Sequence, residues 1–73
     1  MNIKEMVFNQ IKELTKVPFD EKSIIRDLKI DSLDLVILVS KCEEQFQISI
    51  TDDELMNLKT VGDVIKLIGQ KIS

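Results

Sequence analysis

The chain has 73 residues, of which 44% are hydrophobic and 32% are charged, and its formal net charge is −3. A chain this short has room for one hydrophobic core, so we expect a single domain over residues 1–73. No stretch approaches the ~18 uninterrupted apolar residues of a membrane span, no secretory signal is visible, and a single cysteine favours a reducing compartment, so we expect a cytoplasmic protein.

The acidic residues are concentrated in the middle of the chain. Residues 31–54 carry seven acids and one base, a local net charge of −6, whereas the remainder carries six acids and nine bases, or +3. Such an acidic segment suits a basic docking surface on another protein, but on charge alone a solvated face is the more common explanation. Nucleic acid is not an expected partner, because the acidic segment would repel phosphates.

The first predicted element is a helix over residues 3–14. Its apolar residues recur at helical spacing, and Asn2 and Glu5 occupy the positions of a capping box. A long connection follows over residues 16–31. Because it contains several apolar residues, we expect it to pack against the core, and loops of this length often include a short helix or serve a function.

The second predicted helix covers residues 32–45. We expect Cys42 to be a small buried hydrophobic residue and not a reactive thiol, because it lies in the core-facing sector of the helix. That sector contains Leu35, Leu38, Val39, Cys42 and Phe46.

A second apolar stripe runs along the same helix. Leu33, Val36 and Ile37 lie about 120° or more from the core-facing sector. An exposed apolar stripe usually marks an interaction site. The alternative is that the long connection covers it.

Two further helices follow. Thr51 and Glu54 have the spacing of a capping box and predict a short third helix, and Thr60 with Asp63 repeats this spacing before the last helix. No strand is expected. The prediction is therefore an all-α fold, a small four-helix bundle with a long loop between helices 1 and 2 and a short third helix. The apolar stripe of the last helix contains Val61, Val64, Ile65, Ile68 and Ile72.

The chain has few of the residue types that support catalysis. It has no histidine, tyrosine or tryptophan and only one cysteine. The usual general base near neutral pH is therefore missing, as is the commonest metal ligand. The acids at residues 52–54 lack the spacing of a calcium-binding loop. We expect neither catalysis nor a metal site.

The segment Asp31-Ser32-Leu33-Asp34 stands at the head of the second helix. On local grounds Asp31 caps this helix and Ser32 is its first residue. A serine beside an aspartate is not a self-activating nucleophile, so any chemistry at Ser32 needs a base from a partner enzyme.

These residues resemble the acyl carrier protein family, whose motif is Asp-Ser-Leu at the head of the second helix. The similarity extends over nearly the whole chain, through Glu43-Glu44-Gln45-Phe46 and residues 58–64. The resemblance implies that a phosphopantetheinyl transferase, using coenzyme A and Mg²⁺, joins 4′-phosphopantetheine to Ser32, between Asp31 and Leu33. Acyl groups would be held as thioesters on this arm, and partner enzymes would perform the chemistry.

The resemblance also implies two binding surfaces on an expected monomer. Partner enzymes, such as acyl-loading enzymes, ketosynthases, reductases and acyltransferases, would dock on one surface. An acyl chain would be sheltered by Leu38, Cys42 and Ile65. The docking surface would comprise Leu33, Asp34, Val36, Ile37, Glu43, Glu44, Asp52 and Asp53.

Three positions depart from the family pattern. Lys29 stands where the family often has glycine, Ile37 stands where an acid is common, and Lys41 dilutes the acidity of the second helix. A pathway for fatty acids and a specialised pathway for polyketides or other lipids both remain open. Two alternatives also remain, a carrier of aminoacyl or peptidyl groups and a helical interaction module in which Ser32 is unmodified.

Overall fold

The computed structural model describes residues 2–72. These residues form only helices and connections, and their one β feature is an isolated antiparallel bridge between Ile24 and Thr60. The predicted all-α fold, with its long first connection and short third helix, is confirmed. The helices are α1 (Ile3–Leu14), the 3₁₀ helix η1 (Ile25–Leu28), α2 (Ser32–Phe46), α3 (Asp52–Met56) and α4 (Val61–Ile72).

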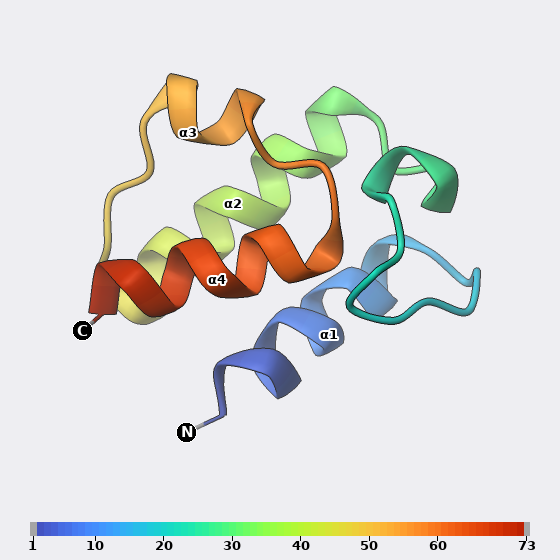
Figure 1. Cartoon of the computed structure of the whole chain (residues 1–73), viewed down its shortest axis with the longest axis horizontal. Helices are drawn as coiled ribbons and strands as arrows, with labels where there is room; N and C mark the ends of the chain where they lie inside the picture. Colours follow the sequence, from blue (N-terminus) through green and yellow to red (C-terminus); the bar gives the residue numbers. More distant parts are fainter. Residues whose placement is uncertain (1, 73) are drawn as a thin grey trace.

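The three long helices pack on one another, α1 against both α2 and α4, and α2 against α4 (Figure 1). The long connection also enters the core through η1, as its apolar residues predicted. Burial removes apolar surface from water and supplies the main stabilisation of the fold. The core consists of Val7, Ile11, Ile25, Leu28, Ile30, Leu38, Cys42, Val61, Val64 and Ile68.

Cys42 is a core residue, as expected. Its side chain is 1% exposed, and burial raises the pKa of its thiol to about 11. Since the thiolate is the nucleophilic form, this thiol is inert at neutral pH.

The helix ends follow local chemistry. The Asn2 side chain accepts the Glu5 N–H at 3.3 Å and caps α1. Helix α2 is one residue longer than predicted, and the N–H groups of Gln47 and Ile48 both return to the Glu43 carbonyl. The Ile48 bond is the 6→1 bond of a Schellman motif and the Gln47 bond is the 5→1 bond of an αL motif, and in both motifs a left-handed residue, here Gln47 with φ 56°, ends the helix.

The apolar stripe of α4 is buried or half-buried except at its C-terminal end. Val61, Val64 and Ile68 are buried and Ile65 is half-buried, but Ile72 is 47% exposed. Ile72 is the last residue of α4, so its place in the periodic stripe does not bring it into the core.

The long connection is attached to the start of α4 by backbone hydrogen bonds. The N–H groups of Val61 and Gly62 donate to the carbonyls of Ser23 and Glu21 at 3.0 and 2.7 Å, respectively. Thr60 and Asp63 cap α4 reciprocally, since the Asp63 carboxylate accepts the Thr60 N–H and the Thr60 hydroxyl accepts the Asp63 N–H. These bonds fix the connection that leads into α2.

Candidate functional site

Ser32 is the first residue of α2, and its neighbour caps the helix. The Asp31 carboxylate accepts the Asp34 N–H at 2.8 Å, and the Asp31 carbonyl accepts the Leu35 N–H at 3.0 Å. The Ser32 hydroxyl takes no part in the hydrogen bonds found among residues 2–72, and the residue is exposed. The helix therefore does not use the Ser32 hydroxyl, which is accessible to another enzyme.

The backbone before Ser32 has an unusual conformation at Lys29. This residue ends η1 with φ 62° and ψ 28°, in the left-handed region, and its N–H donates to the Arg26 carbonyl at 3.2 Å. The next residue, Ile30, is 3% exposed and anchors the chain in the core. Glycine adopts the left-handed region without steric cost, which gives a physical reason for glycine at this position. Lys29 has a Cβ atom, so the same conformation has a steric cost in this chain.

A groove with a volume of about 1040 Å³ opens beside Ser32, between η1, the start of α2, α3 and the connection from α3 to α4. The sequence did not reveal it, because its walls come from segments far apart in the chain. Leu38, Cys42 and Ile65, the predicted acyl pocket, do not line it. Most of its wall is apolar and includes Ile24, Ile30, Leu35, Leu55, Met56 and Leu58.

The predicted apolar stripe on α2 is exposed. Leu33, Val36 and Ile37 are 69%, 44% and 41% exposed, respectively, so the long connection does not cover them. Val36 also lines the groove, together with Met56 of α3, which is 80% exposed. No local sequence pattern assigns a role to Met56.

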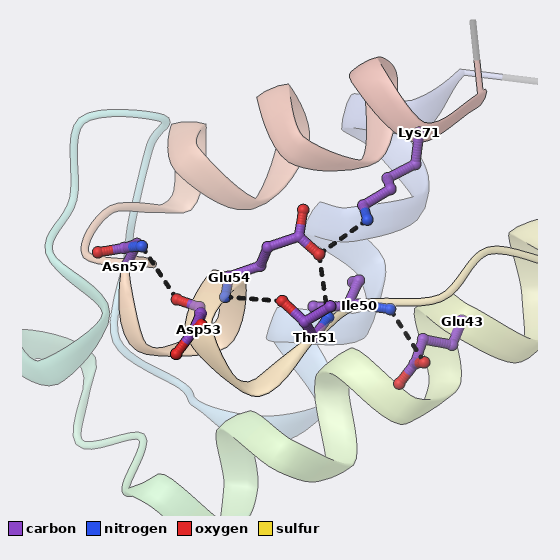
Figure 2. Close-up of polar contacts among 7 residues, drawn as sticks. All are labelled: Glu43, Ile50, Thr51, Asp53, Glu54, Asn57 and Lys71. Carbon is purple, nitrogen blue, oxygen red and sulfur yellow. Dashed lines mark hydrogen bonds and ion pairs between the residues drawn. The ribbon is translucent and has the colours of Figure 1, made fainter.

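The predicted acidic docking residues have different surroundings. Glu44, Asp52 and Asp53 are exposed, and Asp34 is half-buried. Glu43 is also half-buried, and its carboxylate accepts the Ile50 N–H at 3.2 Å (Figure 2). Glu43 therefore stabilises the connection between α2 and α3.

Polar contacts hold α3, which has five residues and none that is buried. Thr51 and Glu54 make both bonds of the predicted capping box, and Lys71 of α4 lies 2.7 Å from the Glu54 carboxylate (Figure 2). The Lys71 contact, followed by the Thr51 N–H, holds the pKa of Glu54 below its ordinary value. Helix α3, one wall of the groove, is thus linked to the end of α4.

Other site types find no support in residues 2–72. No group of three or more His, Cys, Asp or Glu side chains in this part of the chain is placed to hold a metal ion. Nor does any helix there have the length and apolar character needed to cross a membrane.

Comparisons with known proteins identify the family. A family model described as "Phosphopantetheine attachment site" matches residues 7–68. The chain is 49% identical over 71 residues to an acyl carrier protein homolog of Mycoplasmopsis pulmonis, and the match covers 97% of each chain. It is 42% identical over 67 residues to the acyl carrier protein of Wolinella succinogenes, which covers 92% of this chain and 88% of the relative.

The fold is also shared with a solved structure, the acyl carrier protein of Thermotoga maritima. The TM-score is 0.81 at 24% sequence identity, and the match covers 99% of this chain and 92% of the other. The matched domain defines a carrier that bears phosphopantetheine and is not itself a catalyst. The chain belongs to the acyl carrier protein family, and its role implies interaction with biosynthetic enzymes.

Proposed function

We propose that this chain carries acyl groups as thioesters on a 4′-phosphopantetheine arm attached to the Ser32 hydroxyl. The observation that carries the proposal is the division of roles at the head of α2, where Asp31 caps the helix and the Ser32 hydroxyl is exposed and unpaired among residues 2–72. A serine needed for capping could be modified only at a cost in stability.

The attachment reaction needs a base and a metal from the transferase. The Ser32 oxygen forms a bond to the phosphorus that carries the pantetheine group of coenzyme A, and the bond between the two phosphates breaks. The nucleotide bisphosphate leaves, and the serine proton passes to the base of the transferase. Once bound, the arm supplies a terminal thiol that forms thioesters. The fit is supported by the exposure of Ser32 and by the open groove beside it.

Partner enzymes are proposed to dock over α2 and α3. Leu33, Val36 and Ile37 supply apolar contact, and Met56 extends this surface onto α3. The acids Asp34, Glu44, Asp52 and Asp53 would steer a basic partner surface to the site. The proposed partners are a phosphopantetheinyl transferase, acyl-loading enzymes, ketosynthases, reductases and acyltransferases. Glu43 would contribute less, because its carboxylate already binds the Ile50 N–H.

The groove supports an aliphatic cargo of fatty-acid or related lipid or polyketide metabolism. Eight of the fourteen residues that line it are isoleucine, leucine, valine or methionine, which suits an acyl chain better than a polar aminoacyl group. Leu38 and Cys42 lie in the closed core. An acyl chain would reach these two residues only by separating core side chains, and Ile65 is half-buried against that core. We therefore propose that the groove receives the chain first.

The proposal is tested by intact mass spectrometry after incubation with coenzyme A, Mg²⁺ and a broad-specificity phosphopantetheinyl transferase. We expect the parent chain to gain the mass of one phosphopantetheine and Ser32→Ala to gain none. Ser40→Ala is the matched control, since Ser40 is an exposed serine of the same helix, and it should be modified like the parent. Modification of Ser32→Ala would disprove attachment at Ser32.

A further inference from the structure

Three cationic side chains line the groove beside Ser32. Arg26, Lys29 and Lys59 are all exposed, and the ion pairs found among residues 2–72 involve other lysines, namely Lys4, Lys41 and Lys71. The groove has one carboxylate, that of Asp31, which caps α2. Three cations against one carboxylate give the groove a local charge of +2, although the whole chain has −3.

The backbone holds these cations around one opening. Arg26 lies in η1 and Lys29 ends it, whereas Lys59 comes from the connection between α3 and α4. The Ile25 N–H donates to the Lys59 carbonyl at 2.9 Å and joins the two walls. Lys29 and Ser32 are three residues apart, so their Cα atoms lie within about 11 Å of each other.

We propose that Arg26, Lys29 and Lys59 form an anion-binding rim that holds the phosphodiester of the arm at the mouth of the groove. This inference rests on the proposed attachment of the arm at Ser32. The charges are complementary, because a phosphodiester is anionic and none of the ion pairs found among residues 2–72 involves Arg26, Lys29 or Lys59. Holding the phosphodiester there places the arm along the apolar wall formed by Leu35, Leu55 and Leu58. The arm then populates a folded-back position more often than an extended one.

The attraction is modest and depends on salt. Pairs of exposed charges are partly screened by solvent and further screened by ions. A shift of a few-fold in the population of the folded-back arm is therefore expected, and not a locked state. An acidic patch on a partner enzyme could also use the rim, but that role would leave the arm of the isolated carrier unaffected.

The test uses the carrier with phosphopantetheine attached, after intact mass has shown one added group. Nuclear Overhauser contacts between the methyl groups of the arm and those of Leu55 and Leu58 are measured, together with the ³¹P chemical shift. Measurements at about 20 mM and about 500 mM NaCl vary the screening. The variants are the double substitution Lys29→Gln with Lys59→Gln, and Lys22→Gln as the control, because Lys22 is an exposed lysine outside the groove.

We expect the arm contacts in the parent and in Lys22→Gln at low salt. The intensity of these contacts should fall several-fold at high salt and in the double variant. The ³¹P chemical shift should change in the same direction under both conditions. Contacts and shifts that are identical in all samples, or absent from the parent, would overturn the proposal. The salt series on the parent tests the rim even if the double variant fails to fold. A mass increase that is missing with two unrelated transferases would refute the attachment itself, and with it this inference.

Discussion

The Gly62 N–H donates a hydrogen bond to the Glu21 carbonyl oxygen at 2.7 Å, and a Cβ atom added to Gly62 would lie 3.0 Å from that same oxygen. The Glu21 oxygen belongs to the backbone of the long connection, and a Cβ atom on Gly62 would be attached to the backbone of α4. Neither atom can therefore move aside by a side-chain rotation. The connection that leads to η1 and Ser32 thus approaches α4 at a distance that only glycine allows without adjustment.

Alanine at the two glycines of α4 should have opposite effects. We expect Gly62→Ala to lower the free energy of unfolding by about 1–2 kcal/mol, because the new methyl group forces Glu21 away. Gly69→Ala should raise it by about 0.5–1 kcal/mol, because nothing lies within 4 Å of a Cβ there and alanine favours the helix. Urea denaturation measures both. A stabilising Gly62→Ala would show that the close approach imposes no constraint.

Capping and attachment can be separated at the head of α2. Asp31→Ala should lower the free energy of unfolding by about 1 kcal/mol, because the Asp34 N–H loses its acceptor. Ser32→Ala should change it by less than about 0.5 kcal/mol, since the Ser32 hydroxyl takes no part in the hydrogen bonds among residues 2–72. Asp31→Asn is the control that retains a capping oxygen. A larger loss for Ser32→Ala than for Asp31→Ala would favour the serine as the cap.

Lys29 should be a site where glycine stabilises the fold. A side chain in the left-handed region costs roughly 1–2 kcal/mol, and the greater freedom of glycine in the unfolded chain offsets part of the gain. We expect Lys29→Gly to raise the free energy of unfolding by about 0.5–1 kcal/mol. Lys29→Ala removes the same charge but keeps the strain, so it should give no gain. Equal effects of the two substitutions on the free energy of unfolding would show that the left-handed conformation of Lys29 is not strained.

Asp63 should contribute to the loss of folding stability at low pH. The Thr60 N–H, and then the Lys59 N–H, donates to its carboxylate, both at 3.0 Å, and these bonds hold the pKa of Asp63 below its ordinary value. A lowered folded-state pKa stabilises the fold above the unfolded pKa of about 4, and this stabilisation is lost as the pH falls through the folded pKa.

We therefore expect Asp63→Asn to be less stable than the parent at pH 7 and to lose less stability as the pH falls below about 4. Denaturation by urea at a series of pH values measures this difference. Asp53→Asn should follow the parent, because the Asp53 carboxylate accepts no hydrogen bond from any residue between 2 and 72. A pH dependence that is identical in Asp63→Asn and the parent would exclude Asp63 as a contributor.

The local features of the fold were predictable from the sequence because their partners are close in the chain. The caps at Asn2, Asp31 and Thr51 involve residues three positions away, and helical spacing alone separated the core side of α2 from its exposed stripe. The serine at the head of α2 was found through its motif. Its exposure and its freedom from capping required the structure.

The groove could not be predicted, because long-range contacts build it. The bond from Ile25 to Lys59 and the ion pair between Lys71 and Glu54 join segments far apart in the chain. No local pattern signals which of several lysines will face the same opening. The left-handed conformation of Lys29 had only an indirect signal, the glycine that the family often has at this position, because a lysine by itself gives no sign of it.

The central claim is that Ser32 bears the arm, and the most direct measurement is to locate the modification after reaction with coenzyme A and the transferase. Proteolysis and peptide fragmentation should place all of the added phosphopantetheine on Ser32, with none on Ser40 or Ser49 of the neighbouring sequence. Phosphopantetheine on another residue, or a chain left unmodified by two unrelated transferases, would contradict the account.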